Sequence, residues 1–154
     1  MIDLSKLKIK IFADGADIKD MILQLKNPIV RGFTTNPTLM RKAGIINYKK
    51  FALEVLKTID DLPISFEVFA DDPISIYNQA KIISSWGKNV NVKIPITTTK
   101  GENLYDVIKK LSDEGVQLNI TAILTLDQVV KTAESLNKNI FSIISIFAGR
   151  IADT

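Results

Sequence analysis

The sequence contains no cysteine and no histidine. Without cysteine the chain has no disulfide, no thiolate nucleophile and no cysteine-rich metal site. Without histidine it lacks serine–histidine catalysis, the usual zinc ligands and the commonest general base. Any chemistry must therefore use carboxylates, lysine, tyrosine or hydroxyl groups, and no bound metal is expected.

Runs of basic residues and long apolar segments are also missing. The net charge is only +3, and the lysines are spread along the chain, so no nucleic-acid partner is expected. The amino-terminal sequence lacks the apolar region of a signal peptide, and no apolar run approaches the length of a membrane span. We expect a cytoplasmic protein with no membrane partner.

Length and composition are those of a globular domain. The chain has 154 residues, of which 46% are hydrophobic. This is enough to bury a core as about one domain, which we predict to cover residues 1–154.

Two hydrophobic periods alternate along the chain. The strand-like runs are Ile9–Asp14, Ile29–Thr34, Ile64–Phe69, Val90–Ile94, Gln117–Ala122 and Ile140–Phe147. Helical stripes follow them, as in Ile18, Met21, Ile22 and Leu25, with a short turn predicted at Pro37 and a helix over about residues 48–59.

Capping signals mark the later helices. Asp72 before Pro73 predicts a helix start, and that helix is expected to run to about Ser85. Gly115 ends the helix that contains the stripe Leu104, Val107, Ile108 and Leu111. Thr125 with Gln128 three residues later has the form of a capping box.

Strand and helix alternate about every 25 residues, which favours parallel strands with right-handed crossovers. A doubly wound sheet and a (β/α) barrel both fit this alternation. Polar residues decide between them, because each strand carries them on one phase near its carboxyl end while the other phase is apolar. Inward side chains at the top of a barrel meet a shared pocket, whereas an open sheet would bury them under helices. We therefore predict an α/β fold of the (β/α)8 TIM-barrel type with about six βα units in this chain. The polar residues are Asp14, Thr34, Asn36, Ser65, Glu67, Asn91, Lys93, Asn119, Thr121 and Ser145.

Lys93 is the most informative of these residues, because it lies inside an apolar, β-prone run. One interpretation is a structural ion pair with Glu67 or Asp14. The other is a nucleophile that forms a Schiff base, which requires an unprotonated amine in a site of low solvation. The residue type alone leaves both open.

Several motifs together resemble the transaldolase family. The segment from Gly32 to Met40 resembles its second-strand signature, Val92–Pro95 its lysine motif, and Ser145–Asp153 its sixth-strand motif. The runs around Asp14, Glu67 and Thr121 fit the remaining motifs, so the resemblance covers essentially the whole chain in order.

The resemblance implies roles for the matching residues. Lys93 would attack the ketose carbonyl, Glu67 would shuttle protons through a water held by Thr121, and Asp14 would take the proton from the C4 hydroxyl. The substrate-binding residues would be Thr34, Asn36, Asn119, Ser145, Phe147 and Arg150. For the two asparagines a hydrogen-bonded structural role is the alternative, and for Arg150 a surface salt bridge.

The implied activity is transfer of a dihydroxyacetone unit between sugar phosphates in the pentose phosphate pathway, without metal or organic cofactor. The donors would be sedoheptulose 7-phosphate and fructose 6-phosphate, and the acceptors glyceraldehyde 3-phosphate and erythrose 4-phosphate. Members that transfer the unit resemble this chain at Glu67 and Phe147, whereas the related fructose-6-phosphate aldolases carry glutamine and tyrosine there. The alternatives are such an aldolase, which releases dihydroxyacetone, and an inactive barrel fragment.

The chain stops four residues after Arg150. The resemblance implies a seventh and an eighth βα unit beyond this point, so we expect the domain to be incomplete at its carboxyl end. Unpaired edge strands favour association. A homo-oligomer, or a second chain that completes the barrel, is therefore expected.

Overall fold

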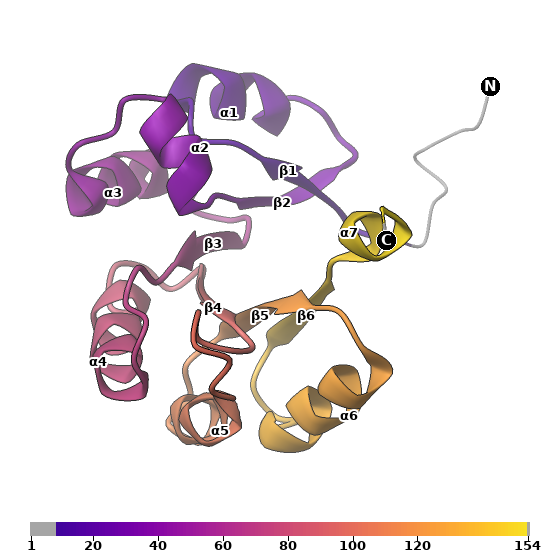
Figure 1. The fold of residues 1–154 in the computed structure, drawn as a ribbon. Helices are drawn as coiled ribbons and strands as arrows, with labels where there is room; N and C mark the ends of the chain where they lie inside the picture. The colour runs from indigo at the N-terminus through magenta and orange to yellow at the C-terminus, as the bar shows by residue number, and fades with distance from the viewer. Residues whose placement is uncertain (1–8, 154) are drawn as a thin grey trace. The chain divides into compact units, whose positions relative to one another are not determined.

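The computed structural model describes residues 9–153 and consists of parallel β-strands that alternate with α-helices (Figure 1). The chain divides into two compact units. Unit 1 comprises residues 9–66 and 86–90, and unit 2 comprises residues 67–85 and 91–153.

Unit 1 contains the first three strands and their helices. Strand β1 (Ile11–Asp14) is followed by α1 (Ile18–Leu25), then β2 (Val30–Thr34), α2 (Pro37–Lys42), α3 (Tyr48–Thr58) and β3 (Ile64–Glu67), whose last residue belongs to unit 2. Each of these helices starts at a polar cap: the side chains of Asp17, Asn36 and Asn47 accept hydrogen bonds from backbone N–H groups of α1, α2 and α3.

The core of unit 1 depends on one close approach and one aromatic cluster. Gly32 pairs with Phe12 across β1 and β2, and a Cβ at Gly32 would lie 2.2 Å from the Phe12 ring, so any other residue there would require this ring to move. Tyr48 packs edge-on against Phe66 and Trp86, with ring centroids 6.1 and 5.1 Å away. Such pairs add about 0.5–1.5 kcal/mol beyond area burial.

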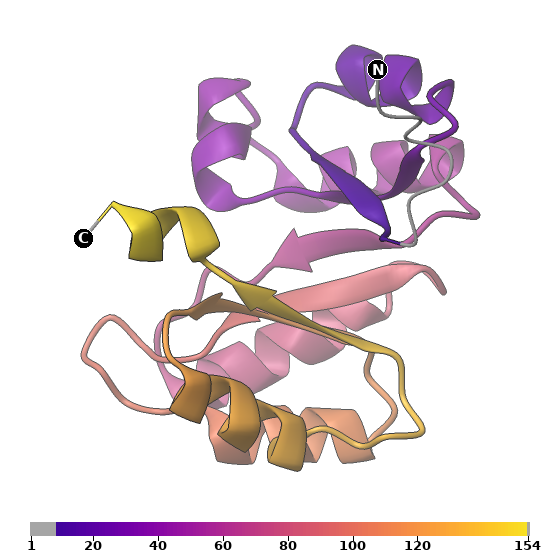
Figure 2. The same cartoon turned by 90° about the vertical axis from the view of Figure 1, so that its right-hand side faces the viewer.

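Unit 2 contains α4 (Pro73–Ser84), β4 (Val90–Pro95) apart from its first residue, α5 (Tyr105–Asp113), β5 (Leu118–Ile123), α6 (Leu126–Ser135), β6 (Ser142–Ile146) and α7 (Ala148–Ala152). Its sheet and helices form separate layers, with α5 and α6 on the same face of β5 and β6 (Figures 1 and 2). Ile108 and Leu111, on the apolar stripe of α5, are fully buried and form part of the core of unit 2.

Strand order distinguishes the two architectures. The order is β1-β2-β3-β4-β5-β6, so each strand neighbours the next along the chain and the order never reverses. A doubly wound sheet requires such a reversal. The prediction of a barrel-type α/β fold is confirmed, while a single domain over residues 1–154 stays a prediction.

Local signals predicted most helix starts. Asp72 caps α4 with Pro73 in its first turn, and Thr125 forms a capping box with Gln128 at the start of α6. The turn predicted at Pro37 is wrong, because Asn36 caps the short helix α2 there. The final helix α7 was not predicted. Strands β1, β2, β3 and β6 are shorter than predicted, as in β3, which ends at Glu67 and not at Phe69, whereas β4 extends one residue further, to Pro95.

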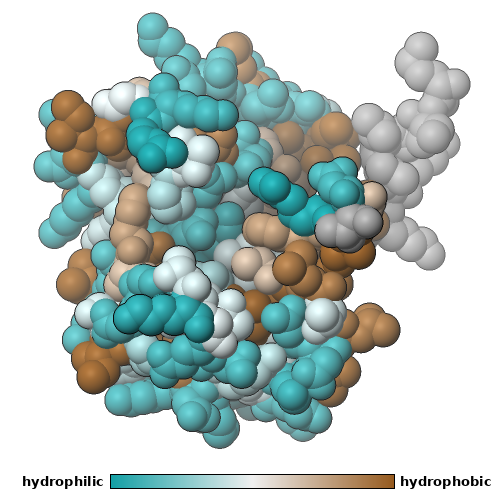
Figure 3. Space-filling view, in the orientation of Figure 1, coloured by the Kyte–Doolittle hydropathy of each residue, from teal (hydrophilic) through white to brown (hydrophobic). Residues whose placement is uncertain are grey.

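The surface carries scattered apolar side chains. In unit 2, Ile146, Phe147 and Ile151 are more than a third exposed. Figure 3 shows hydrophilic and hydrophobic surface side by side in the part of the view where Figure 1 places α7. Within residues 9–153, no helix combines the length and the hydropathy that a membrane span requires.

Candidate functional site

An ion pair between adjacent strands is the centre of the candidate site. Lys93 Nζ lies 3.2 Å from Glu67 Oε2, and the side chains are 12% and 18% exposed. Lys93 lies on β4 and Glu67 is the last residue of β3. The structure therefore brings together two of the predicted catalytic residues, in a place that is shielded from water without being closed to it.

The sequence of β4 explains why Lys93 is held there. Side chains alternate along a strand, so Val92 and Ile94 face one side and Asn91 and Lys93 the other. Val92, Ile94 and Asn91 are fully buried. The apolar pair fixes the strand against the helices, and a slip of one residue would place the lysine in the core.

Further polar side chains follow on β5 and β6. Asn119 is paired with Lys93, and its Oδ1 accepts a hydrogen bond from Ser145 Oγ at 2.7 Å. Thr121 is paired with Pro95 and is 2% exposed. Lysine, carboxylate, amide and hydroxyl side chains thus lie on neighbouring strands of unit 2.

A distortion of β5 accompanies Thr121. The pairing with β6 shifts register between Ile120 and Ile123, and Ala122 has φ of 60°, a left-handed conformation that alanine rarely adopts. Bulges of this kind redirect side chains at strand ends. Thr121 Oγ1 is buried and has no hydrogen-bond partner among residues 9–153, so it has a donor and lone pairs to offer.

The last two predicted residues of unit 2 lie beyond β6. Phe147 precedes α7, donates its backbone N–H to Ile123 O at 2.9 Å, and is 37% exposed. Arg150 lies exposed on α7. Its guanidinium is suited to paired hydrogen bonds with a phosphate.

The predicted residues of unit 1 form a group of their own. Thr34 Oγ1 donates to Asp14 Oδ1 at 2.7 Å, and the two residues pair across β1 and β2. Asn36 uses its Oδ1 to accept from Leu39 N at 3.0 Å as the cap of α2. The amide N–H₂ of Asn36 takes no part in this cap. None of the predicted site roles is tested by these contacts alone.

The sequence does not predict the contacts of two residues in the segments that follow Glu67. Gln79 Oε1 on α4 accepts from the backbone N–H groups of Phe69 and Ala70, and the Asp71 carboxylate accepts from Thr99. Hydrogen bonds from the Thr99 side chain and backbone lower the pKa of Asp71. A glutamine on a helix and an acid in a loop carry no sequence signal for these contacts.

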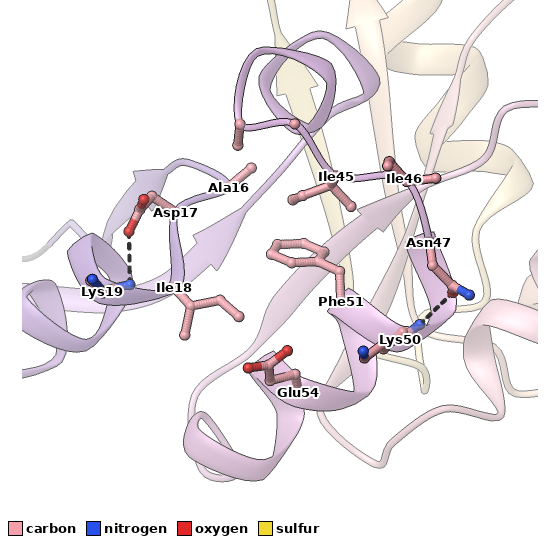
Figure 4. Close-up of a pocket in the computed structure, with 12 residues that line it drawn as sticks. Ala16, Asp17, Ile18, Lys19, Ile45, Ile46, Asn47, Lys50, Phe51 and Glu54 are labelled. Atoms are coloured by element: carbon pink, nitrogen blue, oxygen red, sulfur yellow. Dashed lines mark hydrogen bonds between the residues drawn. The ribbon is translucent and has the colours of Figure 1, made fainter.

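A surface hollow elsewhere in unit 1 does not involve the predicted residues. It has a volume of about 510 Å³, and Ile18, Ile45 and Phe51 converge on it from two sides (Figure 4). Two of its polar side chains, Asp17 and Asn47, are engaged as helix caps. Lys19, Lys50 and Glu54 also line the hollow, so its lining is mixed apolar and charged.

The described residues, 9–153, contain no cluster of side chains suited to bind a metal ion. No group of three or more histidine, cysteine, aspartate or glutamate residues there could hold a metal ion. What the arrangement offers is an amine beside a carboxylate, with hydroxyl and amide side chains on the next strands. Fold and site together define a barrel-type α/β protein with a lysine–glutamate pair at the carboxyl ends of its strands.

Comparison with known proteins agrees with this class. The family model described as Transaldolase/Fructose-6-phosphate aldolase matches residues 11–154. A probable transaldolase of Dehalococcoides mccartyi is 38% identical over 144 residues, which are 94% of this chain and 63% of the relative. One of Herpetosiphon aurantiacus is 32% identical over 94% of this chain and 61% of its own length. One of Thermoplasma volcanium is 35% identical over 146 residues, with 94% and 61% covered.

The chain belongs to the transaldolase/fructose-6-phosphate aldolase family, and the resemblance seen in its motifs is confirmed. It spans about three fifths of the length of the curated relatives it matches.

Proposed function

We propose that the protein is a transaldolase that moves a dihydroxyacetone unit between sugar phosphates through a Schiff base on Lys93. The observation that carries the proposal is the placement of Lys93 Nζ 3.2 Å from Glu67 Oε2 in a largely buried site. A lysine nucleophile needs a partner that takes and returns its protons, and a carboxylate at hydrogen-bonding distance is such a partner.

The first half of the reaction would proceed on Lys93. Its amine attacks the C2 carbonyl of the ketose phosphate, and the carbinolamine loses water to give an iminium ion. Glu67 exchanges the protons of these steps through a water that Thr121 Oγ1 holds. The buried Thr121 hydroxyl without a protein partner in the described chain supports this role.

Carbon–carbon cleavage needs a base and an electron sink. In the proposal, Asp14 takes the proton of the C4 hydroxyl, the C3–C4 bond breaks, and its electron pair passes to the iminium ion. An aldose phosphate leaves and a dihydroxyacetone enamine remains on Lys93. Addition of the enamine to an acceptor aldehyde, followed by hydrolysis of the imine, returns the free lysine.

Binding of the substrate would use the remaining predicted residues. Asn119 and Ser145 hydrogen-bond to each other at 2.7 Å, so they can present a preformed polar pair to the hydroxyl groups of the three-carbon unit. Thr34 and Asn36 would contact the same unit, and Arg150 would hold the phosphate. We propose that the protein acts in the cytoplasm and in the pentose phosphate pathway, as a homo-oligomer and without a cofactor.

The second candidate is an aldolase that releases free dihydroxyacetone. Release requires that a proton donor reach the enamine carbon. Phe147, the residue that precedes α7, has a side chain without an acidic proton. It cannot protonate the enamine, so the enamine would persist until an acceptor aldehyde binds. This favours transfer over release.

An assay with purified chain tests the proposal. Fructose 6-phosphate and erythrose 4-phosphate should yield glyceraldehyde 3-phosphate and sedoheptulose 7-phosphate, and Lys93→Met should abolish the product. Lys109→Met is the control, because Lys109 is a surface lysine paired with Asp113 at 3.0 Å. Free dihydroxyacetone without an acceptor would establish the aldolase, and a folded chain with neither product would contradict both.

A further inference from the structure

The segment 68–71 directly after Glu67 is held by hydrogen bonds at every residue. We propose that Gln79 and Asp71 are positioning residues, which hold this segment and thereby keep Glu67 at hydrogen-bonding distance from Lys93. The kinetic part of this inference rests on the proposed function, while its structural part does not.

Strand geometry explains why Glu67 needs such support. Glu67 is the last residue of the four-residue strand β3, and only Val68 continues the ladder, donating to Lys93 O at 3.0 Å. The next backbone N–H groups have no strand to pair with. Terminal residues of a short strand open locally unless the following chain is fixed.

Gln79 supplies the missing acceptor. Its Oε1 accepts from the N–H groups of Phe69 and Ala70, the latter at 3.0 Å. Because Gln79 lies on α4, these bonds fasten the chain after Glu67 to a helix whose own start is capped by Asp72. Loss of the acceptor would remove both of these hydrogen bonds.

Asp71 fastens the other end of the segment. Its Oδ1 accepts from Thr99 N at 2.7 Å, and its Oδ2 accepts from Thr99 Oγ1. Thr99 belongs to a hairpin that has its own backbone hydrogen bond, from Thr98 N to Glu102 O at 2.9 Å. Gly101 in this hairpin has a left-handed backbone conformation, which glycine adopts without strain.

The hairpin links the Asp71 contact to Lys93. It follows β4, the strand of Lys93, and Thr97 pairs with Asn103 at its base. Asp71 therefore ties together the two segments that follow the two reactive residues. A shift of one segment against the other would change the distance from Lys93 Nζ to Glu67 Oε2.

General stabilisation is the competing explanation, and the chain offers a matched control for it. Gln128 Oε1 on α6 accepts from Leu124 N at 2.8 Å and Thr125 N at 3.2 Å after β5. This is the same kind of cap on another βα loop of unit 2, and no glutamate precedes it. A purely structural effect would be the same for both glutamines.

Crystal structures and trapping rates of Gln79→Leu, Gln79→Glu, Asp71→Ala and Gln128→Leu test the inference. In Gln79→Leu and Asp71→Ala the Lys93–Glu67 contact should lengthen beyond hydrogen-bonding distance, while Gln79→Glu and Gln128→Leu keep it. An unchanged contact in the first two would overturn the inference. Asp71→Ala, on the surface, serves if Gln79→Leu fails to fold.

The kinetic readout is the rate at which borohydride fixes fructose 6-phosphate on the chain. We expect that rate to fall roughly tenfold to a hundredfold in Gln79→Leu, in line with small displacements of reacting groups, and to recover in Gln79→Glu. Equal losses in Gln79→Leu and Gln128→Leu would show a general stability effect and overturn the positioning role. If the parent chain fixes no sugar, the proposed function fails, and the crystal structures alone decide the positioning role.

Discussion

The contact between Lys93 and Glu67 can be measured as a coupling energy. The perturbation is a double-mutant cycle with Lys93→Met, Glu67→Gln and the double variant. At 3.2 Å, the Coulomb attraction is about 5 kcal/mol for an effective dielectric constant of about 20. Removing the two charges from water offsets several kcal/mol of this attraction. We therefore expect a net coupling of about 1–3 kcal/mol.

The single variants should each be destabilised more than the double variant, because each leaves one partly buried charge without its partner. Urea unfolding of the four proteins at neutral pH gives the coupling directly. Raised salt should change it little, since the side chains are only 12% and 18% exposed. Additive effects of the single variants, with a coupling near zero, would refute the reasoning that these charges face each other in a weakly solvated site.

Three further predictions concern unit 2. Tyr77→Phe removes the hydroxyl that donates to Glu114 at 2.8 Å between α4 and α5, and should lower the free energy of unfolding in a urea titration by about 0.5–1.5 kcal/mol. Hydrogen bonds from Thr99 lower the pKa of Asp71 in the folded protein below its ordinary value of 3.8. The contact therefore stabilises the fold above that pH, and this stabilisation is lost as the pH falls through the lowered pKa of the folded state. At that low pH the backbone amide of Thr99 should exchange its hydrogen faster, as measured by NMR, and Asp71→Asn should remove the pH dependence. Thr125→Ala removes one half of the α6 capping box and should lower the free energy of unfolding by about 0.5–2 kcal/mol, seen as a lower thermal unfolding temperature. Thr125→Ser keeps the hydroxyl and should leave that temperature unchanged.

Periodicity and capping residues were sufficient to predict much of the fold. The alternation of strand and helix, with polar residues on one phase of each strand, predicted a barrel-type α/β arrangement. Asp72 before Pro73 and Thr125 before Gln128 marked helix starts where the structure has them. These signals work because each is local: the capping side chain and the backbone N–H it binds are three residues apart.

Contacts between distant residues could not be predicted in this way. The placement of Lys93 against Glu67 required the register of two strands, and residue type alone left both an ion pair and a nucleophile open. The contacts of Gln79 and Asp71 could not be predicted, since their partners lie after a strand end or in another loop. A proline fits both a turn and the first helical position after a cap, and the structure has the second arrangement, with Pro37 opening α2 after the Asn36 cap.

The most direct test of the account is to find which atom becomes covalently bound to substrate. Purified chain is incubated with fructose 6-phosphate and borohydride, digested, and mapped by mass spectrometry, with Lys93→Met and Lys109→Met in parallel. The account predicts a reduced dihydroxyacetone adduct on the peptide that contains Lys93, in the parent and in Lys109→Met alone. A folded parent chain that acquires no adduct, or one that carries it on another lysine, would contradict the account.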